Sequence, residues 1–447
     1  MVRAFKLGAE FIALKSALPD GHALKAREPE KFYSLARRSA DIHRSHPDMS
    51  ELHTVLCLAS YHKGHEFLRE AKRQGWCVYL LTSKSLEGAD WPREALDDIF
   101  YIPDVDKAWN RNDVIKGVSF MARTRRIDRI VALDDFDVET AAALREHLRV
   151  PGMGETPARY FRDKLAMRLK ALEVGIPVPD FCPVTNYDAL RGFMTAVPGP
   201  WLLKPRLSAS ALGIKKINSP AELWPALDAL GDEQSYHLLE SFVPGRVYHV
   251  DSIISDSVVV FAIASRYGAP PLEVMHGGGI FSTIICEHGS AEERALLAAN
   301  AAVLAAMGHV RGASHTEFIR ATDGTFYFLE TSARVGGANI MDLIEAATGL
   351  NLWREWAKVE TQESDYEVAE QRQDYAGLLV SLARQEWPDL RSFDAPEIVL
   401  RIPKRHHVAL VWRSPDYARV EELQREFLAR VQRDFHASAP APDKATD

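Results

Sequence analysis

Short apolar runs alternate with amphipathic stretches between residues 53 and 150. The pattern predicts strands at residues 54–59, 77–82, 99–102 and 129–133, and helices at residues 66–74, 107–123 and 138–148. Strands that alternate with helices pair in parallel and carry the helices on their faces. The pattern therefore predicts a small parallel α/β domain over residues 51–152.

In the rest of the chain the predicted strands follow one another and are joined mainly by turns. They fall at residues 201–205, 214–217, 236–243, 246–254 and 258–264, before a long helix over Ala291–Met307. Residues 374–435 are expected to form a last small α+β unit, with strands at 378–383, 397–400 and 408–412 and a helix at 420–435. The predicted fold class is thus α/β and α+β.

Both ends of the chain lack this patterning. Residues 1–50 are polar and bear His and Arg, and we expect a poorly ordered leader there. Met49, just before the first strand, is a candidate for the native start. Residues 436–447 include Ser-Ala-Pro-Ala-Pro and are expected to be disordered.

A hairpin is predicted where the apolar-rich runs at residues 316–320 and 325–331 flank an Asp-Gly pair at 323–324. Asp-Gly is a strong hairpin signal, because both central residues of a type I′ turn need positive φ. With a two-residue loop, counting outward from the turn places Glu317 opposite Glu330. The same count pairs Thr322 with Thr325, puts Ile319 and Phe328 on the face of the glutamates, and puts Phe318, Tyr327 and Leu329 on the other face.

These two glutamates need a positive charge between them, because like charges directly opposite in an antiparallel pair are destabilising. One interpretation is a divalent cation, Mg²⁺ above all, which binds a few carboxylate oxygens and completes its shell with phosphate and water. Ser332 would add an oxygen on the same face, and Arg334 a fixed positive charge. The alternative is an ordinary hairpin in which Arg320, Arg334 or protonation neutralises the carboxylates.

Two lysines occupy positions that favour an anionic neighbour. Lys164 falls in the first turn of a helix that Asp163 is predicted to cap, at the end where carboxylates are normally favoured. A nearby phosphate explains this position, and a solvated lysine is the alternative. Lys204 lies within the apolar strand at 201–205, where an unpaired charge is costly. The small-residue loop at 206–213 is suited to folding its backbone N–H groups over phosphates.

Composition narrows the class of protein. The 447 residues exceed a single hydrophobic core, and a net charge of −8 without a dense basic stripe argues against a nucleic-acid partner. The four cysteines are scattered with no Cys-x-x-Cys pair, which indicates a reducing compartment. The sequence shows neither a secretory h-region nor a long apolar run, so no membrane partner is indicated and the predicted location is the cytoplasm.

A further segment, residues 268–279, is rich in Gly and Pro. Such segments more often serve as a lid or as part of an acceptor site than as framework. The candidate substrate contacts in and next to it are Arg266, His276, Gly277 and Gly278.

Several motifs follow one another in a recognisable order. They are Arg-Asp-Lys-Leu-Ala-Met-Arg at 162–168, Leu-Leu-Lys-Pro at 202–205, Leu-Leu-Glu-Ser-Phe-Val-Pro-Gly at 238–245 with Val-Asp at 250–251, Thr-Glu-Phe-Ile at 316–319, and Phe-Leu-Glu-Thr-Ser-Ala-Arg at 328–334. This order resembles the ATP-grasp superfamily, closest to its carboxylate-amine ligases, with a biotin-carboxylase-like arrangement of domains. The resemblance covers residues 53–360 and implies an ATP-grasp domain at 153–360 with a lid subdomain at about 180–245.

The resemblance also implies roles for particular residues. Magnesium, with manganese as an alternative ion, would be held by Glu317, Glu330 and Ser332, and Arg334 would stabilise the transferring phosphoryl group as the catalytic arginine. The hinge at 240–243 would read the adenine edge through its main chain. The residues implied to bind ATP are Lys164, Lys204, Ser208, Ser210, Glu240, Ser241, Phe242 and Val243.

The implied activity is an ADP-forming ligation in which a carboxylate is activated as an acyl phosphate and joined to an amine, giving an amide or dipeptide. The partners are then small-molecule carboxylates and amines, and a homodimer is compatible with this activity. Two positions depart from the family pattern: Ser332 stands where asparagine is usual, and Val247 where an acidic residue would bind ribose. The alternatives are an ATP-binding sensor or scaffold and a bicarbonate-activating carboxylase-like enzyme, although no biotinyl carrier motif is visible.

Overall fold

The structure is a computed structural model that describes residues 52–208 and 211–438. The predicted leader, its candidate start Met49, Ser210 of the candidate phosphate loop and nearly all of the predicted disordered tail lie outside the described residues. From Leu52 onward the chain forms one unit, within which the expected domain boundaries remain a prediction.

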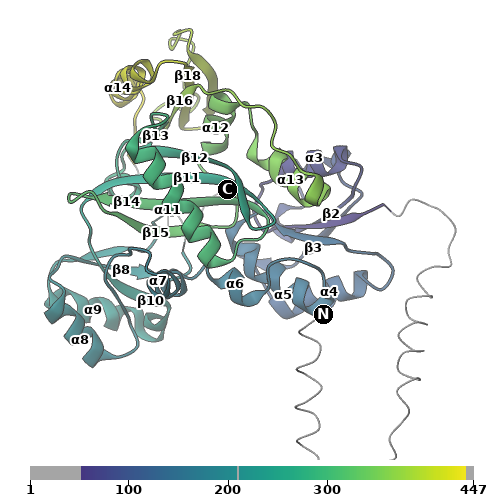
Figure 1. Ribbon diagram of the computed structural model, residues 1–447, viewed down its shortest axis with the longest axis horizontal. Coiled ribbons are helices and arrows are strands. Elements are labelled where there is room, and N and C mark those ends of the chain that lie inside the picture. The colour runs from purple at the N-terminus through teal and green to yellow at the C-terminus, as the bar shows by residue number, and fades with distance from the viewer. Residues whose placement is uncertain (1–51, 209–210, 439–447) are drawn as a thin grey trace, which may run out of the picture. The chain divides into compact units, whose positions relative to one another are not determined.

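The first sheet is small and parallel, as predicted. Its strands are β1 (Thr54–Ala59), β2 (Cys77–Ser83), β3 (Asp98–Ile102) and β6 (Arg129–Ala132), in the order β3-β2-β1-β6. Every residue of β1 is buried, as expected for a central strand with both faces covered. The covering helices are α3 (His65–Arg73), α4 (Arg111–Met121) and α5 (Val138–Leu148) (Figure 1).

One predicted helix begins later than expected. Residues 107–109, which were assigned to it, contribute instead to a short hairpin of β4 (Asp104–Val105) and β5 (Ala108–Trp109). Its turn residues Asp106 and Lys107 have positive φ values of 53° and 65°. Asn110 then caps α4, because its side chain accepts hydrogen bonds from backbone N–H groups of the first turn.

The second sheet is antiparallel and carries Lys204. Its strands are β7 (Phe181–Pro183), β8 (Trp201–Pro205), β9 (Lys215–Ile217) and β10 (His237–Ser241), in the order β7-β10-β8-β9. The helices α8 (Tyr187–Ala196) and α9 (Pro220–Leu230) share an apolar cluster with it. In Figure 1 both helices lie on the side of this sheet away from the large central sheet.

The third sheet has eight strands in the order β15-β14-β11-β12-β13-β16-β18-β17 (Figure 1). Helices pack beside it, and the C-terminal strands continue the same sheet as the hairpin. The predicted α/β and α+β fold class is confirmed. The bounds of these elements are β11 (Gly245–Ser255), β12 (Val258–Tyr267), β13 (Phe281–Ile285), β14 (Gly312–Ala321), β15 (Phe326–Ser332), β16 (Tyr375–Leu382), β17 (Ile398–Lys404), β18 (His407–Ser414), α11 (Ala291–Met307), α12 (Ile340–Thr348), α13 (Leu352–Gln362) and α14 (Tyr417–Asp434).

The hairpin of β14 and β15 pairs Glu317 with Glu330, as predicted, but by a different route. The backbone N–H of Ala321 donates to the O of Thr325 at 2.9 Å, so the loop is one residue longer than expected. The predicted pairing of Thr322 with Thr325 is therefore wrong.

A β-bulge beside the glutamates compensates for the longer loop. Phe318 pairs with Phe328, and Leu329 is the extra residue that restores the register. The predicted faces are wrong as a result, because Phe328 packs with Phe318 in one apolar cluster. Ile319, Tyr327 and Leu329 belong to a second cluster.

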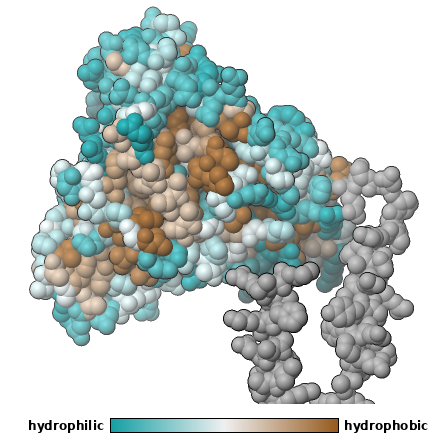
Figure 2. All heavy atoms as spheres, in the orientation of Figure 1, coloured by the Kyte–Doolittle hydropathy of each residue, from teal (hydrophilic) through white to brown (hydrophobic). Residues whose placement is uncertain are grey.

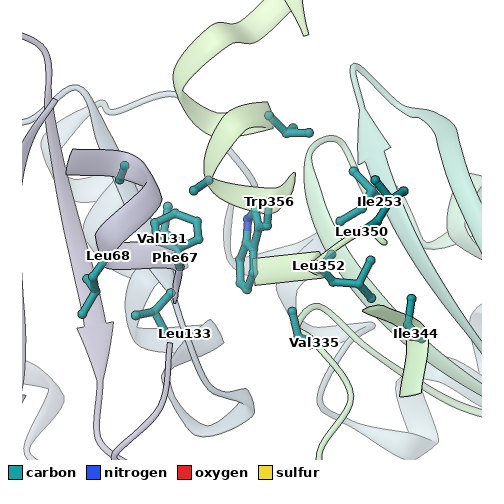
Figure 3. Close-up of a cluster of buried hydrophobic side chains, with 14 of the residues drawn as sticks. Phe67, Leu68, Val131, Leu133, Ile253, Val335, Ile344, Leu350, Leu352 and Trp356 are labelled. Atoms are coloured by element: carbon teal, nitrogen blue, oxygen red, sulfur yellow. The ribbon is translucent and has the colours of Figure 1, made fainter. Parts of the chain in front are cut away.

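The parallel sheet and the large sheet share one hydrophobic core. α3 packs on α13, where the rings of Phe67 and Trp356 lie 5.3 Å apart between centroids. Figure 3 shows Trp356 between Phe67 on one side and Leu352 on the other. This packing holds the loops that follow the parallel strands against the large sheet.

The outer face of α11 is rich in alanine rather than in charged residues. Figure 2 shows hydrophobic side chains gathered in the middle of this view, whereas the end formed by α14 and β18 is hydrophilic. Of the helices in the described ranges, none is long and apolar enough to cross a bilayer.

Candidate functional site

Helix α7 (Lys164–Glu173) places Lys164 against the hairpin. Asp163 caps this helix as predicted, with its side chain accepting hydrogen bonds from the first turn. The Nζ of Lys164 lies 2.6 Å from the backbone O of Ser208 and 2.6 Å from Oε2 of Glu330. Only 11% of the lysine side chain is exposed, so the alternative of a solvated lysine is wrong.

Lys204 has an anionic partner, as its buried position requires. Its Nζ lies 2.6 Å from Oε1 of Glu240, and Nε of Arg168 donates to Oε2 of the same carboxylate at 2.9 Å. Burial alone would raise the pKa of Glu240, but the charges of Arg168 and Lys204 hold that pKa below its ordinary value. Glu240 is thus a buried side chain that stays charged.

Arg168 was not predicted as a site residue. Its side chain is fully buried, and Nη1 also donates to the backbone O of Leu329, the residue before Glu330. Arg168 follows Lys164 by four residues, a spacing that puts both on one face of a helix. That spacing was the sequence signal that could have identified Arg168. Its contacts with Glu240 and Leu329 link the regions around Lys164 and Lys204 to the hairpin.

The paired glutamates each have one oxygen engaged. Oε1 of Glu317 accepts a hydrogen bond from the hydroxyl of Tyr267 at 2.8 Å, and Oε2 of Glu330 faces Lys164. In the part of the chain that the structure describes, the second oxygen of each carboxylate has no hydrogen bond or ion pair. Burial acts to raise the pKa of Glu317, but nearby His315 and the hydrogen bond from Tyr267 keep that pKa below its usual value, so the carboxylate stays charged.

The two arginines that an ordinary hairpin would need are engaged elsewhere. Arg320 donates to Glu292 at 2.9 Å, and Nε of Arg334 donates to Oδ2 of Asp135 at 2.7 Å. Neither contact involves Glu317 or Glu330, so an ordinary hairpin in which these arginines pair with the two carboxylates is not supported.

A buried hydrogen-bond network stands behind Glu317 and was not predicted. Asp251 accepts from Nδ1 of His249 at 2.6 Å and from Nδ1 of His315 at 2.8 Å. Nε2 of His315 lies 3.6 Å from Oε1 of Glu317. Burial opposes a charge on His315, but Asp251 outweighs it and raises the pKa of His315 to about 10. The ligand atoms of the three residues are close enough for a metal, yet both oxygens of Asp251 are already used by the imidazoles.

Arg334 is held by a residue from the parallel sheet. Asp135 lies in the turn after β6, 199 positions away in sequence, and Nη1 of Arg334 donates to the O of Val335 at 2.9 Å. Within residues 52–208 and 211–438, the remaining nitrogen, Nη2, makes no hydrogen bond. Burial opposes the charged guanidinium, but Asp135 and Asp134 outweigh it and raise the pKa of Arg334.

In the predicted adenine hinge, residues 240–243, two of the backbone N–H groups already donate hydrogen bonds within the protein. The N–H of Ser241 donates to the O of Asp180 at 2.8 Å, and the N–H of Phe242 donates to the O of Pro200 at 3.0 Å. For the N–H of Val243, no acceptor lies within the described residues. Val243 is therefore the hinge donor that remains open to a ligand.

The two residues that depart from the ATP-grasp pattern, Ser332 and Val247, lie in different environments. Ser332 pairs with His315 across the hairpin, beside the glutamates. Val247 is buried in an apolar cluster with Tyr267 and Ile319. Only Ser332 is placed where it could supply an oxygen to the glutamate site.

Within the described residues, no hydrogen bond or ion pair joins Arg266 to the other predicted substrate residues at 276–278. Nη2 of Arg266 donates to Oε1 of Glu421 in α14 at 2.8 Å. The expected loop at 268–279 is wrong in part, because α10 (Pro271–Gly277) forms there, started by proline at its first position and ended by Gly278 at a φ of 65°. His276 and Gly277 are exposed at the end of this helix.

The parallel sheet, the second sheet with its lysine and the large sheet with its paired glutamates together form the ATP-grasp fold. An L-amino acid ligase structure from Bacillus licheniformis matches with a TM-score of 0.68 at 18% identity, over 87% of this chain and 99% of that one. The ADP complex of an N5-carboxyaminoimidazole ribonucleotide synthetase matches with a TM-score of 0.64 at 15% identity, over 86% and 100% of the two chains. These likenesses confirm the predicted fold.

Curated relatives cover less of the chain. An L-arginine-specific L-amino acid ligase of Bacillus subtilis is 27% identical over 232 residues, which are 51% of this chain and 56% of that protein. A D-alanine--D-alanine ligase of Pseudomonas fluorescens is 23% identical over 212 residues, 46% of this chain and 65% of that protein. The chain thus matches a little over half the length of the first of these relatives. No family model matches the chain.

Proposed function

We propose that this protein is an ATP- and Mg²⁺-dependent ligase that activates a carboxylate as an acyl phosphate and joins it to an amine, releasing ADP and phosphate. The observation that carries the proposal is the contact of one lysine, Lys164, with both the loop at Ser208 and the paired carboxylate Glu330. This contact brings together a lysine suited to binding phosphate and a carboxylate suited to binding a metal ion.

The chain's own residues fit the nucleotide. Lys164 and Lys204 would bind phosphates, and Ser208 with the loop around it would cover them. Val243 would donate its N–H to the adenine edge, while Glu240 keeps Lys204 in place. Arg168 orients Glu240 and so acts as a positioning residue.

The glutamates fit a divalent cation. Each carboxylate offers one uncommitted oxygen across the strand pair, and hard oxygen donors are what Mg²⁺ prefers. Glu317 and Glu330 would hold the ion, with Ser332 as an additional oxygen. Bound there, the ion would offset phosphate charge during transfer.

Arg334 would stabilise the phosphoryl group as it moves. The oxygen of the substrate carboxylate attacks the terminal phosphorus, and the bond to ADP breaks. The amine nitrogen then attacks the acyl carbon, phosphate leaves, and the amine loses a proton. Asp135 fixes the guanidinium, so the open Nη2 can meet the transferring group without reorganisation.

The names of the relatives favour amino acids as both substrates, since they include an L-arginine-specific L-amino acid ligase and D-alanine--D-alanine ligases. Arg266, His276, Gly277 and Gly278 are proposed to lie on the substrate side. The four cysteines are unpaired in the structure, which supports a reducing, cytoplasmic setting. A homodimer is compatible with the fold.

Phosphate release tests this proposal. With ATP, MgCl₂ and a panel of L-amino acid pairs, particular pairs should stimulate release at least tenfold over ATP alone, with a product whose mass equals the pair minus water. Glu330→Gln should lower kcat by roughly 10²–10³-fold, the size expected for loss of an electrostatic contact to a developing charge. It should also weaken Mn²⁺ binding measured by electron paramagnetic resonance, whereas the exposed control Glu426→Gln should change neither.

Two outcomes would favour the other functions. Tight ATP binding with no turnover for any pair would support the sensor, for which Ser332 and Val247 were the sequence arguments. Release stimulated by bicarbonate alone would support the carboxylase-like enzyme.

A further inference from the structure

A cavity of about 240 Å³ lies where β6 and α5 meet the start of β14 and α13. We call it the junction cavity. It is lined by Arg129, Arg145, His309, Arg311, Trp356 and Glu360, together with apolar side chains from the same elements. None of the residues that we assign to ATP or magnesium lines it. Ala333, between Ser332 and Arg334 in sequence, does so.

The polar lining carries an excess of positive charge, with three arginines against one glutamate. Arg145 has no acidic contact partner among the described residues: its guanidinium donates to the backbone O atoms of Ile130 and Met153. Burial, together with the nearby charge of Arg311, lowers the pKa of Arg129 despite its acidic neighbours. Arg129 pairs with Glu363 and Arg311 pairs with Asp256, both through Nη2, so these contacts leave the Nε of each arginine free to meet a ligand.

Three buried nitrogens of this lining have no hydrogen-bond partner among the described residues: Nε of Arg129, Nε of Arg311 and Nδ1 of His309. Buried polar atoms are normally paired, and an unfilled ligand or water site is a common reason when they are not. The two arginine nitrogens are cationic donors. Nε2 of His309 lies 3.1 Å from the O of Ala313 and must carry the proton, so neutral Nδ1 is an acceptor.

The cavity thus offers three kinds of contact. Arg129 and Arg311 supply donors for an anionic oxygen. His309 and the carboxylate of Glu360, whose Oε1 also accepts from Trp356 at 3.1 Å, supply acceptors for a cationic or neutral donor. Apolar surface is supplied by Ile130, Val138, Met153 and Trp356.

We propose that the junction cavity binds a zwitterionic α-amino acid with an apolar side chain, at a site separate from the ATP-grasp centre. The carboxylate would meet Arg129 and Arg311, the ammonium group would meet Glu360 and His309, and the side chain would lie against the apolar wall. A simple anion would use only the first of these contacts. Because Ala333 lines the cavity, the occupant would touch the segment that carries Ser332 and Arg334.

Calorimetric titration of the full chain without nucleotide tests this site and does not depend on the proposed ligase activity. The probe is leucine. The analogues are 4-methylpentanoate, which lacks the ammonium group, 3-methylbutylamine, which lacks the carboxylate, and inorganic phosphate. Leucine should bind, and each analogue should bind at least tenfold more weakly.

Variants assign the binding to the cavity. Arg129→Gln and Arg311→Gln should each weaken leucine binding at least tenfold, whereas Arg334→Gln and the exposed control Arg425→Gln should leave it unchanged. Because the arginine variants also lose ion pairs, Val138→Phe provides a second test that fills the cavity without changing charge. Circular dichroism confirms that each variant is folded.

The remaining outcomes overturn the proposal. Binding that is lost in Arg334→Gln but kept in Arg129→Gln would place leucine at the ATP-grasp centre. Phosphate binding as tightly as leucine would make the cavity a simple anion site. Absence of leucine binding at millimolar concentration would leave a cavity filled by water.

Discussion

Arg168 connects several parts of the candidate site through one guanidinium group. Without it, Glu240 would be buried with Lys204 alone, and the carbonyl of Leu329 would lose its donor. We expect Arg168→Met to lower the free energy of unfolding by about 3–5 kcal/mol, the range for breaking a buried ion pair. Urea denaturation followed by tryptophan fluorescence measures this change.

The matched control is Arg191→Met, since Arg191 pairs with Asp188 on the surface and both side chains are largely exposed. Its loss should stay below about 1 kcal/mol. If Arg168→Met and Arg191→Met both lowered the free energy of unfolding by less than about 1 kcal/mol, the buried network around Glu240 would not stabilise the fold as described.

His309 makes the folded protein sensitive to acid. Burial lowers its pKa to about 4 from the ordinary 6.5, so between these values the unfolded chain binds a proton that the folded chain does not. The contribution of neutral His309 to the free energy of unfolding is therefore fully present above pH 6.5. It is lost as the pH falls toward 4, and the loss amounts to up to roughly 3 kcal/mol. We expect His309→Gln to reduce the difference in unfolding free energy between pH 7 and pH 4 by that amount.

Urea denaturation at both pH values, without added amino acids, provides the measurement. The exposed His407→Gln is the control and should leave the pH dependence unchanged. If the free energy of unfolding of His309→Gln still changed with pH as in the unmodified protein, another group would govern the pH dependence between pH 7 and pH 4.

Some site residues were predictable because their signal is local. Lys164 stands beside a helix cap and Lys204 inside an apolar strand, so each is conspicuous among its sequence neighbours. Asp135 was not predictable, because its partner Arg334 is 199 positions away and nothing near Asp135 distinguishes it from other turn residues. His315 was missed for the same reason, since its partner Asp251 lies on another strand.

At the scale of elements, the hairpin shows how a correct pairing can follow from an incorrect turn. Type I′ needs positive φ at both central residues, but only Gly324 has it, at 92°. The loop therefore takes an extra residue. The bulge then adds Leu329 to β15 between the pair Phe318–Phe328 and the pair Glu317–Glu330, and this second extra residue restores the predicted pairing of the glutamates. Turn chemistry is a local preference, whereas the bulge depends on packing that the sequence pattern does not display.

This turn can be tested at Gly324. A side chain at that φ costs roughly 1–2 kcal/mol for an L-residue, so Gly324→Val should lower the free energy of unfolding by that amount. Gly324→Asn should cost less, because asparagine tolerates positive φ better. Thermal unfolding measures both, and Thr322→Val in the same exposed loop is the control that should change little.

At the scale of the whole molecule, stability depends on the core that the parallel sheet and the large sheet share. Phe67 is fully buried and meets Trp356 of α13 there (Figure 3). We expect Phe67→Ala to lower the free energy of unfolding by about 3–5 kcal/mol. Calorimetry should show the main transition shifted to lower temperature as a whole.

The control is Phe120→Ala, since Phe120 is 69% exposed. It should move the transition little. If Phe67→Ala instead split off a separate low-temperature transition, the two sheets would unfold independently, contrary to the shared core.

The alternation of strands and helices was sufficient to predict the parallel sheet, although not that β1 pairs with β6, the last of its four strands in sequence. The continuity of the large sheet was not predictable in the same way. It depends on the pairing of β13 with β16, which nearly a hundred intervening residues separate, and no periodicity reports which strands become neighbours.

That pairing has a consequence for a shortened chain. β13 lies between β12 and β16, so proteolysis near residue 373 would strip its outer side of hydrogen-bond partners. An open strand edge of this kind recruits strands from other molecules. Such a fragment would therefore be expected to aggregate, and the C-terminal strands serve as the cover that keeps this edge from self-association.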